Sequence, residues 1–109
     1  MSYIPEKGDL VWINFNPQAG HEQSGNRPAI VLSPLAYNQK VGLALFCPVT
    51  NKKKGYPFEV DLPSSCTISG VILSDQVKSL DWKIRNIQFI ESLNTSILDD
   101  VLAKLTTLL

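Results

Sequence analysis

Apolar residues fall into several short runs along the first ninety residues, and glycine, proline or asparagine separates one run from the next. β-Branched and aromatic residues dominate these runs, so the pattern indicates β-strands. Two runs, 28–33 and 43–49, are apolar almost throughout, which is typical of central strands covered on both faces. The predicted strands are 9–15, 28–33, 43–49, 58–62, 70–73 and 84–90.

The C-terminal segment follows a different period. Apolar residues after Asn94 recur at helical spacing, which predicts an amphipathic helix whose apolar face packs on the sheet. Ser96 and Asp99 have the spacing of a capping box at its start. A shorter helical turn is expected around 35–39. The apolar positions of the terminal helix are Ile97, Leu98, Val101, Leu102, Leu105 and Leu108.

Strands this close together, joined by short turns, favour an antiparallel and barrel-like sheet. We therefore expect a mainly β fold, a small barrel of antiparallel strands with a C-terminal α-helix. The length of 109 residues fits one domain, 1–109, and no internal repeat divides it.

Charge and cysteine content exclude several classes of function. Ten Lys and Arg balance ten Asp and Glu, so any nucleic-acid binding needs a local basic patch, and histone-like binding is excluded. Cys47 and Cys66 form no CxxC motif and His21 is the only histidine, so we expect no structural zinc site. No cofactor is expected either. Neither a leader sequence nor a membrane span is visible, which predicts a cytoplasmic protein without membrane contact.

The polar segment 17–28 is the most informative part of the chain. It joins two predicted strands and carries His21 and Arg27, and polar loops on a rigid sheet are where function concentrates. A solvated Glu22–Arg27 ion pair and a solvated histidine are the alternatives, and composition alone favours them. Arg27 precedes Pro28 at the mouth of a strand, which restrains the backbone and confines the guanidinium.

A local basic patch surrounds the end of the third predicted strand. Residues 40–54 carry four positive charges and no negative one, which suits phosphate, although a solvated hairpin tip is the alternative. Thr50 ends the strand, and Tyr56 and Phe58 bring aromatic rings that suit base stacking unless they belong to the core. The four lysines are Lys40, Lys52, Lys53 and Lys54.

A second polar loop is expected at 74–79. Asp75 and Gln76 have the groups to bind base edges or a ribose hydroxyl, and Lys78 has the charge to meet a phosphate. A turn-stabilising role for Asp75 is equally compatible with the local sequence.

Several motifs, taken in order along nearly the whole chain, resemble the MazF/PemK toxin endoribonucleases. This resemblance implies an SH3-like barrel that forms a homodimer, cuts single-stranded RNA at short sequences without a metal ion, and is neutralised by a MazE-like antitoxin. It also implies products with a 2′,3′-cyclic phosphate and a 5′-hydroxyl. The motifs are Gly8–Asp9–Leu10–Val11–Trp12, Gly20–His21–Glu22–Gln23 with Arg27–Pro28, Pro48–Val49–Thr50, Gly55–Tyr56–Pro57–Phe58 and Asp75–Gln76–Val77–Lys78.

The resemblance also assigns roles to residues. It makes Arg27 and Thr50 the catalytic pair, with Glu22 close by, so that Arg27 stabilises the phosphorane and Thr50 donates a hydrogen bond to it. We assign His21 an auxiliary role in proton transfer, because histidine ordinarily titrates near neutral pH. Whether Asp75 takes part in proton transfer or only contacts RNA stays open. The expected RNA-binding residues are Asn26, Lys52, Lys53, Lys54, Tyr56, Asp75, Gln76 and Lys78.

Two other functions are compatible with the same fold. One is a CcdB-like toxin that grips gyrase without cutting RNA, and the other is a non-catalytic RNA-binding barrel. A gyrase binder has no need for Arg27, Thr50 and a basic strip, and the helix end, 105–109, lacks an aromatic or charged tip. A non-catalytic barrel would keep its RNA affinity after Arg27→Ala.

Overall fold

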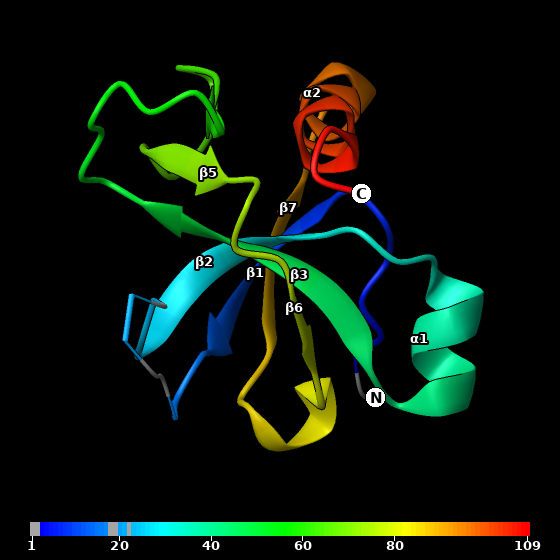
Figure 1. Cartoon of the computed structure of the whole chain (residues 1–109). Coiled ribbons are helices and arrows are strands. Elements are labelled where there is room, and N and C mark those ends of the chain that lie inside the picture. Colours follow the sequence, from blue (N-terminus) through cyan, green and yellow to red (C-terminus); the bar gives the residue numbers. More distant parts are fainter. Residues whose placement is uncertain (1–2, 18–19, 22) are drawn as a thin grey trace.

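Seven strands form one antiparallel sheet in the computed structural model, which describes residues 3–17, 20–21 and 23–109 (Figure 1). The strands are β1 Asp9–Asn14, β2 Asn26–Val31, β3 Ala44–Thr50, β4 Glu59–Asp61, β5 Val71–Leu73, β6 Lys78–Leu80 and β7 Gln88–Ser92. The helices are α1 Leu35–Val41, the 3₁₀ helix η1 Trp82–Ile84, and α2 Thr95–Thr106.

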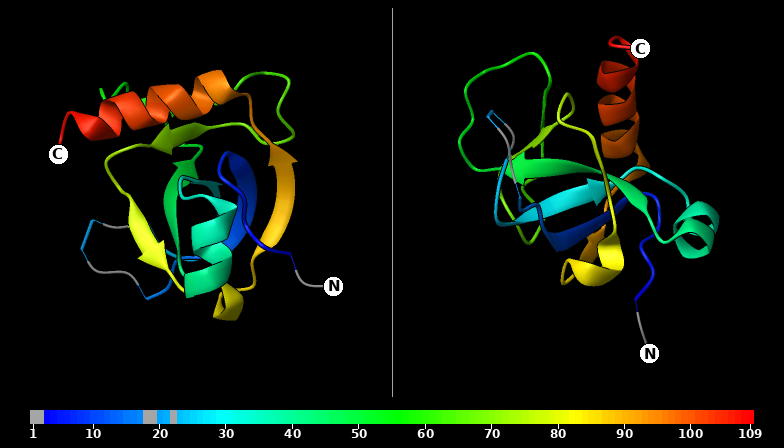
Figure 2. Two further views of the ribbon diagram at one scale, coloured as in Figure 1. Left: turned by 90° about the vertical axis from the view of Figure 1, so that its right-hand side faces the viewer. Right: turned by 60° about the horizontal axis from the view of Figure 1, so that its bottom comes forward.

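The sheet runs in the order β4-β5-β3-β2-β1-β7, and β3 is its branching point. β2 pairs with the middle of β3, whereas β6 pairs with its first residues and β5 with its last. The strands curve round the centre of the molecule and α2 lies across them (Figure 2). The outermost strands of this order, β4 and β7, do not pair with each other, so the barrel is open. A mainly β antiparallel fold with a C-terminal helix is confirmed.

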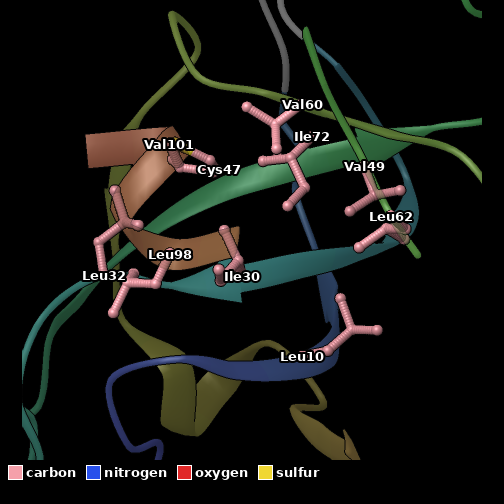
Figure 3. Close-up of a cluster of buried hydrophobic side chains, with 10 residues drawn as sticks. All are labelled: Leu10, Ile30, Leu32, Cys47, Val49, Val60, Leu62, Ile72, Leu98 and Val101. Carbon is pink, nitrogen blue, oxygen red and sulfur yellow. The ribbon is translucent and has the colours of Figure 1, made fainter. Parts of the chain in front are cut away.

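Both faces of the central strands are buried. Alternate side chains of β1, β2 and β3 enter two apolar clusters, which agrees with the apolar runs 28–33 and 43–49. Each fully buried aliphatic side chain contributes about 1.5–3 kcal/mol to stability. The first cluster contains Leu10, Ile30, Leu32, Cys47, Val49, Val60, Leu62, Ile72, Leu98 and Val101 (Figure 3). The second contains Val11, Ile13, Phe15, Ala29, Val31, Ala44, Phe46, Leu80 and Trp82.

Helix α2 closes the first cluster with Leu98 and Val101, as its apolar spacing predicted. The predicted capping box at Ser96 and Asp99 is wrong, because the helix begins one residue before Ser96. Asn94 is the N-cap, and its side chain accepts a hydrogen bond from the Ser96 amide at 3.0 Å. No helix in the described part of the chain is long and apolar enough to cross a bilayer.

The sequence prediction also fails between β5 and β7. The first two residues of β6, Lys78 and Ser79, belong to the segment predicted as a polar loop, because a three-residue strand is too short to show a period and forms by pairing with β3. The predicted strand 84–90 divides into the end of η1, a turn and β7. Asn86 in that turn has φ 54°, a conformation that ends the helical segment before the strand begins.

Candidate active site

A groove of about 540 Å³ opens where β2 and β3 meet three connecting segments. Its walls come from the β1–β2 segment, the strand residues beside it, the segment between β3 and β4, and the connection from β5 to β6. The residues that line it are His21, Gln23, Ser24, Arg27, Thr50, Lys52, Lys54, Tyr56, Glu59, Leu73, Asp75 and Gln76.

Strand register brings Arg27 and Thr50 together in this groove. β2 and β3 pair antiparallel with Ala29 opposite Pro48. Continued by two residues, this register places Arg27 across from Thr50. Because side chains alternate between faces, residues two apart share a face of the sheet. The two side chains that the sequence placed at separate strand ends therefore line one groove.

The Arg27 guanidinium is oriented by the backbone of its own loop. Its Nε donates a hydrogen bond to the carbonyl oxygen of Ser24 at 2.8 Å, and the side chain is half-buried. Arg27 is also paired with Ile13 in the β1–β2 ladder, so its Cα is fixed by the sheet. Within the described residues, no hydrogen bond occupies the terminal nitrogens of the guanidinium, and such a fork is suited to bind an anion in the groove.

Thr50 is buried, and its hydroxyl is held at the groove wall. Its Oγ1 accepts a hydrogen bond from the Lys52 amide at 3.2 Å, so its own proton stays available to a second acceptor. The backbone of Gly70, just before β5, packs closely against the backbone of Thr50. A Cβ at Gly70 would stand 2.6 Å from the Thr50 carbonyl oxygen, so only glycine permits this approach.

The segment between β3 and β4 is shaped by Glu59. The Glu59 carboxylate accepts hydrogen bonds from the backbone amides of Lys54 (3.0 Å), Gly55 (3.1 Å) and Tyr56 (3.3 Å). Lys52 and Lys54 line the groove. Lys53 does not, because its ammonium pairs with Asp61 at 2.9 Å on the protein surface, and this partner raises the pKa of Lys53.

Two hydrogen bonds join the walls of the groove. The Tyr56 hydroxyl donates to Asp75 Oδ2 at 2.7 Å, which raises the pKa of Tyr56, and the Tyr56 ring packs 5.7 Å from that of Phe58. The Gln23 amide donates to Gln76 Oε1 at 3.1 Å. Asp75 is thus a structural partner of the aromatic residue as well as a lining residue, and its Oδ1 is buried with no partner among the described residues.

The remaining predicted site residues lie in different places. His21 lines the groove, whereas Glu22 lies outside the described residues. Lys78 lines a neighbouring cavity of about 160 Å³, which shares Gln23, Asp75 and Gln76 with the groove. Asn26 is exposed opposite Asn14 and lines neither cavity.

Lys40, counted with the basic run in the sequence, belongs to α1. That helix lies on the opposite side of the molecule from the segment between β3 and β4 (Figure 1). The basic surface at the groove is therefore smaller than the run of lysines suggested.

Gln23, Ser24 and Glu59 shape the groove through hydrogen bonds, and the sequence did not identify them as site residues. Glu59 occupies one position of an alternating strand, where a carboxylate is ordinarily solvated, and Ser24 and Gln23 contribute through their backbones. No residue type signals such roles. Across residues 3–17, 20–21 and 23–109, no three His, Cys, Asp or Glu side chains gather as a metal-binding group.

Comparisons with known proteins identify the family of the chain. Residues 6–109 match the family of PemK-like, MazF-like toxins of type II toxin–antitoxin systems. The chain is 54% identical over 83 residues to the endoribonuclease toxin MazF of Escherichia coli K12, covering 76% of this chain and 74% of that protein.

Solved structures show the same likeness. The crystal structure of MazF from Deinococcus radiodurans superposes with a TM-score of 0.96 at 52% identity, covering 98% of this chain and 97% of that one. A MazE–MazF complex from Deinococcus radiodurans superposes with a TM-score of 0.87 at 46% identity, covering 98% of this chain and 96% of that one. The chain therefore belongs to the family of PemK-like, MazF-like toxins of type II toxin–antitoxin systems.

Proposed function

We propose that this chain is an endoribonuclease toxin that cleaves single-stranded RNA in the groove between Arg27 and Thr50. The observation that carries the proposal is the convergence of these two side chains in one groove of a chain that is 54% identical to an endoribonuclease toxin. Cleavage of messenger RNA by such an enzyme stops translation and growth.

The substrate supplies its own nucleophile in this reaction. The ribose 2′-oxygen attacks the adjacent phosphorus, a new P–O2′ bond forms and the P–O5′ bond breaks, so no water is consumed. The products are a 2′,3′-cyclic phosphate and a 5′-hydroxyl. The 2′-hydroxyl loses one proton and the leaving 5′-oxygen gains one, and the reaction needs a base, an acid and an anion clamp but no metal ion.

Each catalytic residue has a role in this scheme. Arg27 binds the phosphorane oxygens, whose negative charge increases in the transition state, and the Thr50 hydroxyl donates to one of them. Glu22 and His21 are the proposed proton carriers. Arg27 is assigned no proton transfer, because a guanidinium stays protonated in proteins.

Recognition of the RNA is assigned to the surrounding wall. Lys52 and Lys54 meet backbone phosphates, Tyr56 stacks on a base, and Asp75 and Gln76 bind base edges. Lys78 extends the contact into the neighbouring cavity. Lys53 and Asn26 stand outside both cavities, so we expect smaller contributions from them.

The partner of the toxin is a MazE-like antitoxin, as the MazE–MazF complex of Deinococcus radiodurans supports. We propose that an acidic and apolar segment of the antitoxin lies along the groove and excludes RNA. We also propose a cytoplasmic homodimer of one-domain chains, a proposal consistent with the family match over residues 6–109.

The decisive experiment is cleavage of a long unstructured RNA by the purified protein in excess EDTA, with Arg27→Ala as the control variant. We expect cuts at short recurrent sequences, 5′-hydroxyl ends that need phosphorylation before ligation, and cyclic phosphates on the other fragments. RNA that stays intact while it binds would favour a non-catalytic RNA-binding barrel. Neither binding nor cleavage would favour a gyrase-type target.

A further inference from the structure

We propose that Arg85 is a positioning residue for the cleavage reaction. It binds the start of the β1–β2 segment at Asn14 and Asn16, and through Asn16 it holds the end of that segment, which orients Arg27. The inference rests on the proposed function for its kinetic consequence. Its structural part, the link from Arg85 to Arg27, stands independently. Arg85 is 58 residues from Arg27 in the sequence and follows η1, outside every sequence motif of the family resemblance.

Arg85 grips the end of β1 with its side chain and its backbone. Its Nη1 donates hydrogen bonds to the carbonyl oxygens of Asn14 at 3.1 Å and Asn16 at 2.6 Å. Its own carbonyl accepts a hydrogen bond from the Asn14 amide at 3.0 Å. The chain is thus held from both sides at the point where it leaves β1.

Hydrogen bonds then connect Asn16 and Phe15, at the start of the β1–β2 segment, to Gly25 at its end. Asn16 Oδ1 accepts a hydrogen bond from the Gly25 amide at 2.9 Å, and the Phe15 amide donates to the Gly25 carbonyl at 2.9 Å. The residue before Gly25 is Ser24, whose carbonyl orients Arg27 Nε. Three hydrogen bonds, linked through the covalent bonds of Asn16 and the Ser24–Gly25 peptide, therefore connect the Arg85 guanidinium to the Arg27 guanidinium.

Arg85 is placed neither as an ion-pair partner nor as an RNA contact. It has no acidic group within ion-pair distance among the described residues, so it is not half of a surface salt bridge there. It lines neither cavity, so direct contact with RNA in the groove is not its role. Its Nε is buried without a partner in the described structure, and such burial of a charged group is a poor source of stability.

The expected consequence is kinetic. A misplacement of a catalytic group by about 1 Å can lower a rate by about 100-fold. Without the hydrogen bonds from Arg85, the start and the end of the β1–β2 segment should move relative to each other, and Arg27 should leave its position. RNA affinity should change little, because the lysines and Tyr56 stand on the other wall.

The test compares Arg85→Met, which keeps the apolar stem, with Arg85→Lys, which restores a donor at its end. Lys83→Met is the matched control, since Lys83 is an exposed cation on η1, the short helix that Arg85 follows, and its ammonium lies over the Trp82 ring rather than against the β1–β2 segment. We expect Arg85→Met to lower kcat by about tenfold to 100-fold with KM within about twofold, and Arg85→Lys to recover part of it. A rise in KM at constant kcat would instead make Arg85 an RNA contact.

A spectroscopic measurement separates positioning from general stability and does not depend on cleavage. The chain has two arginines, so an Arg85 variant shows a single arginine Nε–H signal, that of Arg27. In Arg85→Met this signal should move toward the position of a solvated guanidinium and exchange faster, and in Lys83→Met it should not. An unchanged Arg27 signal in a folded Arg85→Met protein overturns the proposal, whatever happens to activity.

Discussion

The groove has a strand wall, which contains Arg27 and Thr50, and a lysine wall, which contains Lys52, Lys54 and Tyr56, and these two walls are built in different ways. Arg27 and Thr50 stand on β2 and β3, where cross-strand pairing fixes their backbones and Thr50 is buried. Lys52, Lys54 and Tyr56 stand on an exposed segment that has no ladder of its own and is held by the Glu59 carboxylate.

Under the proposed function, this difference separates the residues assigned to the chemistry from those assigned to RNA recognition. Phosphoryl transfer needs groups held closely in place, and paired strands provide that. Recognition tolerates variation, and a segment held by side-chain hydrogen bonds to Glu59 and Asp75 can change its shape without moving the sheet. We therefore expect changes to the strand wall to act on kcat, and changes to the lysine wall to act on KM and sequence preference.

The largest effect should follow Arg27→Ala. Loss of one preorganised donor to a developing anion typically costs about 100-fold to 1,000-fold in kcat, and RNA affinity should fall far less. Single-turnover cleavage and equilibrium RNA binding measure the two quantities separately. Lys40→Ala, which removes an exposed cation from α1, is the control. Equal losses of rate and affinity would reduce Arg27 to a phosphate anchor and break the comparison.

Gly70→Ala should disturb the strand wall through the packing of β5 against Thr50. The added Cβ would stand 2.6 Å from the Thr50 carbonyl oxygen and 3.1 Å from a methyl group of Val49, so β3 and β5 must separate. We expect a stability loss of about 1–3 kcal/mol, as overpacking typically causes, and a lower kcat.

Gly55→Ala is the matched variant on the lysine wall. A Cβ at Gly55 meets no atom within 4 Å, although φ is 75° there, so only local backbone strain results. Its effect should appear in KM. Denaturant unfolding together with steady-state kinetics compares both variants, and an effect of Gly70→Ala on KM alone would contradict the assignment of Thr50 to the chemistry.

Glu59→Ala should have a moderate effect. It removes the acceptor of three amide hydrogen bonds and loosens the segment that carries Lys54 and Tyr56. We expect KM to rise about fivefold, the equivalent of about 1 kcal/mol, with an altered preference in the mapped cleavage sites. Glu59→Gln keeps one acceptor oxygen and should fall between Ala and the parent chain. An unchanged KM and an unchanged site preference would show that the segment needs no such support.

The smallest effect concerns the cysteines and pH. Burial, with the nearby charge of Asp75, raises the pKa of Cys47 on β3 to about 12, and burial and Glu91 raise the pKa of Cys66. A raised pKa keeps a thiol protonated, so at mildly alkaline pH iodoacetamide should modify half-buried Cys66 slowly and Cys47 only on unfolding. Mass spectrometry follows both sites. Rapid native labelling of Cys47 would show that β3 opens and that the strand wall is not rigid.

Local sequence pattern predicted the elements better than the contacts between them. The apolar runs located most strands, and the helical spacing after Asn94 located α2, because both patterns depend on neighbours a few residues apart. β6 was missed for the opposite reason, since it is a strand only by virtue of its partner β3.

What the amino-acid sequence determined by itself was the set of candidate site residues and their places near the ends of strands, above all Arg27 and Thr50. Only the tertiary structure decided that one strand register brings these two residues together. It also decided that Lys53 pairs with Asp61 away from the groove and that Gly70 packs against the Thr50 backbone. These outcomes depend on residues far apart in the chain, whose distances are set by packing and pairing of the whole sheet and leave no local period to read.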